Sequence, residues 1–303
     1  MPLIIAVVPT FNPDADVTVR LEALAAQCDA VIVVDDGSGD RAEPALAGIE
    51  AAGYALLRHA GNRGIAAALN TGIAAALDRG ADYVVNLDQD TLVPPGYVAA
   101  CLAVFDGAAR ATRLGIVCAD AINGSPSIPP RHSPEGFGLV GEAIQSGMVI
   151  SAECLRVAGL MDERLFIDCV DTEFCLRVGE SGFRIAVASG TNLQHALGAQ
   201  VPFKPFGVQR MRDGRPALYQ YHSPVRRYFI TRNNIDLGLR YLRRQPRWVA
   251  SAVRRESVPA AKHIVGGPHR FRHLLAAICG TAHGLIRRRG PLSPSLRRAL
   301  TPR

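Results

Sequence analysis

The sequence predicts an α/β protein with a sheet flanked by helices, followed by a basic and mainly helical C-terminal region. Short β-branched runs alternate with Ala-rich helical stretches through the first 120 residues, which is the pattern of βαβ units. Polar residues follow directly after four of the five runs, and the balance of charge changes sign near residue 200. Together these observations predict a sheet whose strand ends carry a site, and a separate basic segment.

The hydrophobic pattern places the elements in order along the chain. Apolar residues at three- and four-residue spacing predict helices between the strands. The expected strands cover 3–8, 30–35, 54–58, 83–87 and 115–119, and the expected helices cover 17–28, 41–52, 64–79 and 95–105. A Pro/Gly/Ser-rich loop is expected over 123–141, a strand over 144–151, a short helix over 153–158, and amphipathic helices over 219–243 and 271–288.

The net charge of +7 averages two unlike parts. Residues 1–200 hold 12 Arg, no Lys and 24 acidic residues, whereas residues 201–303 hold 22 basic and 3 acidic residues. This split predicts a boundary near residue 200 between an acidic part that carries a site and a basic part that faces a polyanion. Anionic lipid, phosphorylated substrate and nucleic acid all fit that charge, and a solvated tail without a specific partner is the alternative.

Cysteine usage and the first residues bear on the compartment. Seven cysteines without regular spacing fit neither a disulfide framework nor a zinc cluster. The apolar run over 3–8 lacks a basic flank and is too short for a signal peptide or a membrane span, so we expect a first strand there. The expected location is the cytoplasm, peripheral on the inner face of the plasma membrane.

Two acidic motifs stand at expected strand ends. Asp88 and Asp90 are two residues apart, so in extended backbone their carboxylates point to the same side and can share a hard cation such as Mg²⁺ or Mn²⁺. Asp35 and Asp36 precede Gly37 and Ser38, which suit a tight turn and a helix cap. A carboxylate there can accept from a base imide or a ribose hydroxyl, although a turn and cap alone would also explain the motif.

The segments VPTFN (8–12), VVDDGS (33–38), NRGIAAALNTG (62–72) and LDQD (87–90) resemble the family 2 glycosyltransferases of GT-A fold. SGM (146–148) and LFIDCVDTEFCLR (165–177) are similar to the rhamnosyltransferase branch of that family. The resemblance spans about residues 3–235 and implies a nucleotide-sugar-binding mixed sheet. With the charge split it leads us to expect a GT-A catalytic domain over 1–200 and a basic helical region over 201–303 on the acceptor or membrane side. The Glu-Asp pair common in the wider family is Val170-Asp171 here, a departure that also occurs in the rhamnosyl branch.

The resemblance assigns roles residue by residue. It implies Asp171 as the general base and a metal site at Asp88, Asp90 and His195. The nucleotide-binding residues that we expect from it and from the strand-end pattern are Pro9, Thr10, Phe11, Asp35, Asp36, Asn62, Gly64 and Asp88. Residues expected near the acceptor or diphosphate are Glu173, Arg232 and Asn233.

A purely structural explanation is an alternative for three of these assignments. Asp171 opens an expected helix, where a carboxylate also complements the helix dipole. His195 can be structural rather than a ligand. Arg232 and Asn233 can belong to a basic helix face.

The resemblance predicts an inverting, metal-dependent glycosyltransferase that moves a single sugar. It favours L-rhamnose from dTDP-β-L-rhamnose, transferred to a hydroxyl of a cell-surface glycan such as O-antigen, or of a lipid-diphosphate-linked acceptor. A UDP- or GDP-linked donor stays open. A nucleotidyl transferase would need a Gly-rich phosphate loop near the first strand, and residues 9–13 offer none. A nucleic-acid-binding protein would need aromatic residues among the Arg runs, but the aromatic residues of 243–303 are only Trp248 and Phe271. We therefore expect no nucleic acid as partner.

Overall fold

The protein was analysed as a computed structural model that describes residues 1–195 and 198–302. It divides into two compact units: Met1–Glu163 with Val170–Ala196, and Arg164–Cys169 with Leu197–Arg303. The short segment 164–169 thus belongs with the C-terminal helices, although its neighbours in sequence belong to the first unit. The functional boundary expected at residue 200 stays a prediction, because compactness alone does not establish where a catalytic domain ends.

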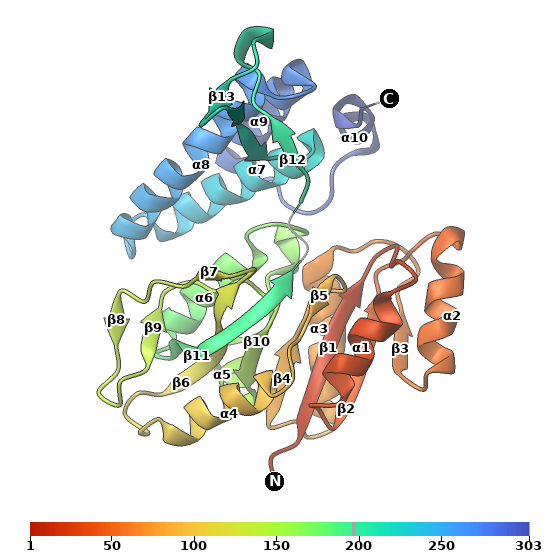
Figure 1. Ribbon diagram of the computed structural model, residues 1–303, viewed down its shortest axis with the longest axis vertical. Helices are drawn as coiled ribbons and strands as arrows, with labels where there is room; N and C mark the ends of the chain where they lie inside the picture. Colours follow the sequence, from red (N-terminus) through yellow and green to blue (C-terminus); the bar gives the residue numbers. More distant parts are fainter. Residues whose placement is uncertain (196–197, 303) are drawn as a thin grey trace. The chain divides into compact units, whose positions relative to one another are not determined.

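The first unit is built on one mixed sheet (Figure 1). Its order is β3 (Ala55–Arg58), β2 (Ala30–Asp35), β1 (Ile4–Thr10), β4 (Tyr83–Asn86), β10 (Met148–Ser151), β6 (Leu114–Ile122), β11 (Arg184–His195), β9 (Gly138–Val140) and β8 (Arg131–His132). The first four strands are parallel, and β10 runs antiparallel to both of its neighbours. The carboxyl ends of β1, β2 and β4 therefore meet at one edge, where α/β proteins bind ligands.

Helices cover both faces of this sheet. They are α1 (Val17–Ala25), α2 (Glu43–Ala51), α3 (Ile65–Asp78), α4 (Tyr97–Gly107), α5 (Ala152–Ala158) and α6 (Val170–Glu180), with short 3₁₀ turns η1 (Asp40–Ala42) and η2 (Glu163–Leu165). In Figure 1, α1 and α4 lie on one face, and α3, α5 and α6 lie on the other. This is the layered arrangement that alternating strands and helices predict.

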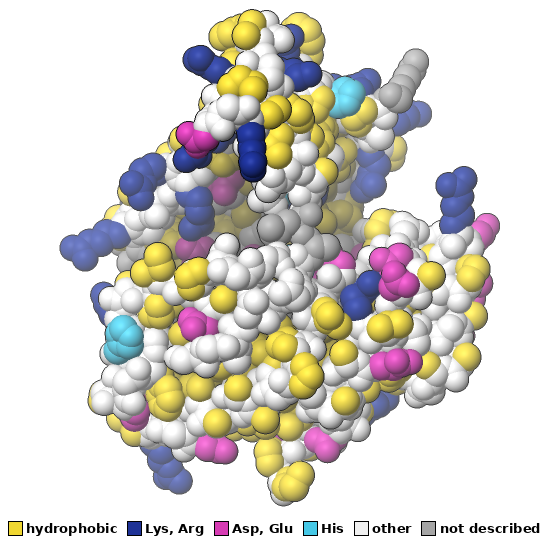
Figure 2. All heavy atoms as spheres, in the orientation of Figure 1, with side chains coloured by type: hydrophobic (Ala, Val, Ile, Leu, Met, Phe, Trp, Pro, Cys, Tyr) yellow, Lys and Arg dark blue, Asp and Glu magenta, His cyan; other side chains and the backbone are white. Residues whose placement is uncertain are grey.

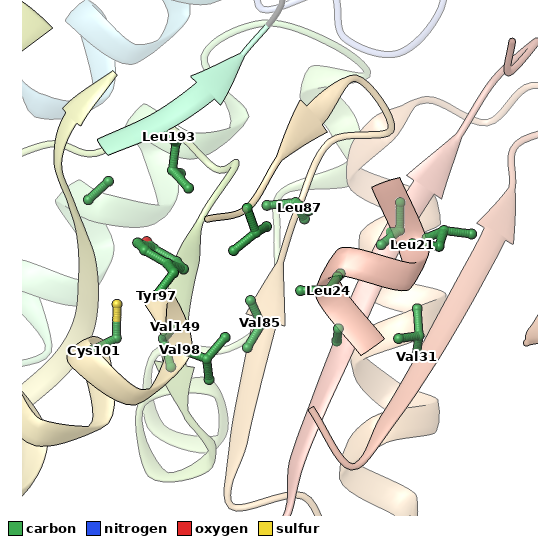
Figure 3. Close-up of a cluster of buried hydrophobic side chains, with 14 of the residues drawn as sticks. Leu21, Leu24, Val31, Val85, Leu87, Tyr97, Val98, Cys101, Val149 and Leu193 are labelled. Carbon is green, nitrogen blue, oxygen red and sulfur yellow. The ribbon is translucent and has the colours of Figure 1, made fainter. Parts of the chain in front are cut away.

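Buried aliphatic side chains hold α1 and α4 on the sheet (Figure 3). Leu21 and Leu24 of α1 belong to the same buried cluster as Val85 of β4 and as Tyr97 and Cys101 of α4. Since burial of one such side chain contributes roughly 1.5–3 kcal/mol, this cluster fixes the strands whose ends carry the polar motifs.

The expected strands and helices of residues 1–120 are present with ends shifted by a few residues. The expected loop over 123–141 is not wholly irregular, because it also contains β7 (Ser125–Pro126), β8 and β9. β7 pairs with β6, and β9 pairs with β11. Such short edge strands are specified by pairing with neighbours rather than by local pattern, so the loop's composition did not reveal them.

The second unit contains four α-helices and two small two-stranded sheets among its described residues. The helices are α7 (Pro224–Tyr241), α8 (Pro246–Gly266), α9 (Arg270–Leu285) and α10 (Pro294–Leu300). One sheet pairs β12 (Gln200–Pro202) with β15 (Leu218–Gln220), and the other pairs β13 (Met211–Arg212) with β14 (Arg215–Pro216); η3 (Pro205–Gly207) lies between β12 and β13. Ser223 caps α7 by accepting from Arg226 N–H at 3.3 Å, so that helix begins later than residue 219.

Small residues let α9 approach α7 closely. A Cβ atom on Gly280 would lie 2.9 Å from the Tyr228 carbonyl oxygen, and one on Gly284 would lie 2.8 Å from the Arg232 carbonyl oxygen. Helix α8 was not expected from the sequence. It contains Pro259, which interrupts the helical signal, and its buried residues are Ala252, His263 and Gly266. No helix in the described ranges is long and apolar enough to cross a membrane.

Candidate active site

Three metal-ligand side chains converge at the sheet edge. Asp88 and Asp90 follow β4, and His195 ends β11. One ligand atom from each lies within 4.8 Å of the other two. The two aspartates lie in the turn between β4 and β5 (Thr91–Leu92) rather than in extended backbone, and β5 pairs with β11 so that Thr91 faces His195. Two carboxylates and one imidazole are a donor set that fits Mn²⁺ or Mg²⁺ completed by donor oxygens.

Neutral side chains form hydrogen bonds that hold Asp88 and His195 in place. Gln145 Nε2 donates to Asp88 Oδ1 at 2.5 Å, and the Asp88 backbone N–H donates to Ser146 Oγ at 2.9 Å. Thr91 Oγ1 lies 2.7 Å from Ser146 Oγ and 2.7 Å from His195 Nδ1. Because Gln145 and Ser146 are almost fully buried, they hold the carboxylate and imidazole in set orientations.

The electrostatics of Asp88 suit a cation. The pKa of Asp88 is raised to about 6, mainly by burial; the carboxylates of Asp90 and Asp171 act in the same direction, whereas His195 and Gln145 act to lower it. Ionising a buried carboxylate beside two other carboxylates costs free energy, because it loses hydration and the negative charges repel one another. A divalent cation would offset that repulsion. The contribution of Asp171 also means that its charge reaches the cluster from α6.

Asp36 organises the loop after β3. Its carboxylate accepts from the backbone N–H groups of Arg63 at 2.9 Å and Gly64 at 2.8 Å, and it lies 2.9 Å from His59 Nδ1. His59 Nε2 in turn lies 2.9 Å from Thr71 Oγ1 on α3. Asp36 is therefore held firmly by three protein groups, and its contact with a nucleobase stays a prediction.

Asp35 and Gly37 shape the neighbouring turn. Asp35 accepts from both the backbone N–H and the hydroxyl of Ser38. Gly37 has φ +72°, and a Cβ there would lie 2.3 Å from the Gly61 carbonyl carbon, so only glycine fits. The turn after β2 thus lies directly on the loop that contains Asn62, whose side chain is exposed.

The end of β1 is tied to the acidic turn. The Phe11 backbone N–H donates to Gln89 Oε1 at 2.9 Å, and Gln89 Nε2 donates to the Phe11 carbonyl at 3.3 Å. Pro9 and Thr10 are buried, whereas the Phe11 side chain is 46% exposed beside this edge. An exposed ring supported in this way can stack on a base, and the expectation that this segment binds the nucleotide stays a prediction.

Asp171 lies in the first turn of α6 and is partly buried. Glu173, two residues later, is buried and forms a two-point pair with Arg177, with distances of 3.0 and 2.8 Å. This pair fixes Glu173 against its own helix. Its predicted contact with the acceptor or the diphosphate is not tested by this geometry and stays a prediction.

Arg232 and Asn233 lie in α7 of the second unit, each 1% exposed. Their side chains donate to backbone carbonyls of that unit, including Leu165 and Asp168. The geometry gives both residues a structural task, and direct contact with the diphosphate or acceptor stays a prediction.

Sequence reasoning missed the residues that support the site. Gln145, Ser146 and Thr91 support the candidate metal ligands, His59 supports Asp36, and Gln89 supports the backbone of Phe11. Ser146 and Gln89 lie within the SGM and LDQD segments, Gln145 and Thr91 directly adjoin them, and His59 directly follows the strand expected over 54–58, but no role was assigned to any of them from the sequence.

Comparison with known proteins identifies relatives of this arrangement. The model of the family described as glycosyl transferase family 2 matches residues 5–134. The dTDP-rhamnosyl transferase RfbF of Shigella flexneri is 31% identical over 244 residues, which are 76% of this chain and 78% of that protein.

Solved structures share the fold at lower identity. The mannosyltransferase PcManGT of Pyrobaculum calidifontis, solved with GDP-Man and Mn²⁺, superposes with a TM-score of 0.54 at 16% identity, over 94% of this chain and 87% of that one. TarS of S. aureus superposes with a TM-score of 0.50 at 17% identity, and the match spans 78% of this chain and 39% of TarS. At such identities these likenesses establish the architecture alone.

Proposed function

Because the chain belongs to the family 2 glycosyltransferases and has their GT-A fold, we propose that it transfers L-rhamnose from dTDP-β-L-rhamnose to a hydroxyl group. The observation that carries the proposal is the convergence of Asp88, Asp90 and His195 at the sheet edge that also holds the DDGS turn. The donor sugar is supported by the relative from Shigella flexneri, which is a dTDP-rhamnosyl transferase.

Each part of the site has a task in this reaction. The edge formed by Pro9, Phe11 and Asp36 binds the nucleoside. Asp88, Asp90 and His195 would hold Mg²⁺ or Mn²⁺, which neutralises charge on the donor diphosphate and on the leaving group. Gln145, Ser146 and Thr91 keep these ligands oriented before the donor arrives.

Asp171 acts as the general base in a single displacement that inverts the anomeric centre. The acceptor hydroxyl oxygen attacks the anomeric carbon and its proton passes to the Asp171 carboxylate, while the bond from that carbon to the diphosphate oxygen breaks. The products are the glycosylated acceptor and dTDP. Asp171 is partly buried, and its charge acts on Asp88, so its carboxylate is suited to this task beside the proposed metal and diphosphate site.

The acceptor is a cell-surface glycan, such as an O-antigen precursor, presented on a lipid diphosphate at the cytoplasmic face of the plasma membrane. The basic region would hold the enzyme there, since residues 201–303 hold 22 basic and 3 acidic residues. On the face shown in Figure 2, many Lys and Arg side chains project from the second unit. Each basic residue near an anionic surface contributes about 1 kcal/mol.

Helix α9 adds an apolar face that fits the same membrane. Its large apolar side chains recur at helical spacing and fall within about 120° of the helix circumference. They are exposed: Phe271 87%, Leu274 43%, Leu275 36%, Ile278 58% and Leu285 58%. The opposite side of α9 is buried and carries His273, Ala276, Gly280 and Gly284. An exposed apolar stripe with Arg at both ends is typical of a helix that lies in the headgroup region of an anionic bilayer.

A panel of nucleotide sugars tests the donor. The purified protein is incubated with Mn²⁺, a lipid-linked glycan extract, and dTDP-β-L-rhamnose, UDP-glucose or GDP-mannose, and release of nucleoside diphosphate is measured. We expect turnover with dTDP-β-L-rhamnose to exceed that with the other donors by at least tenfold. Preferential turnover of a UDP- or GDP-linked sugar would overturn the donor assignment, and no turnover with any donor would overturn the enzyme's proposed reaction.

A further inference from the structure

The segment that leads into Asp171 has an unusual backbone. Phe166, Asp168 and Cys169 have φ values of 69°, 62° and 60°, although none is glycine. Side chains with a Cβ rarely occupy this left-handed region, so the loop 164–169 persists only because its surroundings fix it.

Asn233 supplies one set of contacts that fix the loop. Its Nδ2 lies 2.8 Å from the carbonyl oxygens of both Ile167 and Asp168, and 3.2 Å from that of Leu165. One amide group thus serves three carbonyls of a loop that forms neither helix nor strand over 166–169.

Arg232 supplies the second set. Its Nη2 donates to the Leu165 carbonyl at 2.8 Å, its Nη1 donates to the Gly290 carbonyl at 2.5 Å, and its Nε donates to Asn233 Oδ1 at 2.9 Å. The last bond orients the Asn233 amide so that its N–H groups face the loop. Burial lowers the pKa of Arg232, which shows that the charged guanidinium loses hydration free energy here. A well-packed apolar side chain would avoid this desolvation cost.

We propose that Arg232 and Asn233 are positioning residues for the general base: they hold the loop 164–169, and with it the start of α6, in the conformation that Asp171 needs. The chain passes from Cys169 to Asp171 through Val170 alone, so a shift of the loop reaches the carboxylate directly. This inference rests on the proposed role of Asp171. Neither residue touches substrate in this scheme, and both act through the loop backbone.

The test compares Asn233→Ala with a control in the same helix. Ser223→Ala removes the α7 cap without touching the loop carbonyls. We expect Asn233→Ala to lower kcat roughly thirty- to a hundredfold with donor KM within about twofold, because displacement of a reacting group by about 1 Å is sufficient for such losses. Hydrogen–deuterium exchange over 165–170 should quicken in Asn233→Ala, and Ser223→Ala should leave both kcat and this exchange near wild type.

The outcomes separate this inference from the proposed function. If Asp171→Asn keeps wild-type activity, the base assignment fails, while the exchange measurement still reports whether Asn233 holds the loop. If Asp171→Asn is inactive but Asn233→Ala keeps kcat within twofold, the positioning role is wrong. It is equally wrong if the loss of kcat in Asn233→Ala matches the fraction unfolded, measured by circular dichroism, or recurs in Ser223→Ala.

Discussion

His195 Nδ1 lies 3.5 Å from Asp90 Oδ1, although the two residues belong to distant parts of the chain. The pairing of β5 with β11 creates this relationship, because it sets Thr91, the residue after Asp90, opposite His195. The Asp90 side chain is 42% exposed and that of His195 is 21% exposed, so both remain accessible to an incoming ion. Strand pairing, rather than the acidic motif alone, therefore completes the candidate metal site.

Asp90→Ala should lower transfer about a hundredfold, because loss of one ligand weakens the stabilisation of charge on the leaving diphosphate. The measurement is nucleoside diphosphate release over a Mn²⁺ titration. Asp106→Ala, which removes an exposed carboxylate from α4, should behave as wild type. Full activity of the wild-type protein in excess EDTA would show that no divalent ion is needed.

Asp171→Asn should abolish transfer while donor affinity changes by less than about twofold, because the base is needed only when the acceptor hydroxyl attacks. Isothermal titration with dTDP in the presence of Mn²⁺ measures the affinity. A loss of dTDP binding as large as the loss of rate would instead assign Asp171 to helix capping.

Phe271→Glu with Ile278→Glu should abolish flotation with liposomes that contain phosphatidylglycerol, because two charges would then lie in the apolar face of α9. Wild type should float at low salt, float less at high salt, and remain below liposomes of phosphatidylcholine alone. Val19→Glu, at a 61% exposed apolar position of α1, is the matched control and should float like wild type.

Failure of wild type to float at low salt would contradict the membrane role. A dimer in sedimentation velocity that the double variant dissociates would, together with that failure, identify the α9 face as a contact between copies of this chain.

The second unit should lose stability in mild acid. The pKa of His273 is lowered to about 3 and that of His222 to about 4; burial is the main cause in both cases, and nearby Arg227 and His263 act in the same direction. His269 acts on His273 in the same direction, and Arg226 on His222. The unfolded chain therefore binds more protons than the native state below about pH 6.5. Above that pH the histidines do not reduce the free energy of unfolding. As the pH drops towards 4, the free energy of unfolding falls by up to about 1.4 kcal/mol per pH unit for each histidine.

Thermal unfolding between pH 7.5 and 4.5 measures this slope. His273→Phe should flatten it, because the ring nitrogens of His273 have no hydrogen-bond partner within the described residues and the substituted ring cannot take up a proton. Tyr221→Phe alters an aromatic neighbour of His273 without removing a histidine, and should keep the wild-type slope. Equal slopes for wild type and His273→Phe would refute the prediction.

Local pattern was sufficient for much of the first unit. The range 30–35 was predicted and is observed as β2, and Val17 opens both the expected helix and α1. Such elements carry their hydrophobic periodicity within the segment itself. The short strands β7 to β9 were not predicted because they depend on pairing with neighbouring strands. Helix α8 was not predicted because it buries small and polar residues.

The sequence by itself determined the family, the alternation of strands and helices, and the carboxylates Asp36, Asp88 and Asp171, because these are properties of residue type and local spacing. The tertiary structure alone decided which groups support them. Gln145 reaches Asp88, His59 reaches Asp36, and Asn233 reaches the loop before Asp171. Hydrogen bonds act over about 3 Å in space without regard to separation along the chain, so no local pattern encodes these partners.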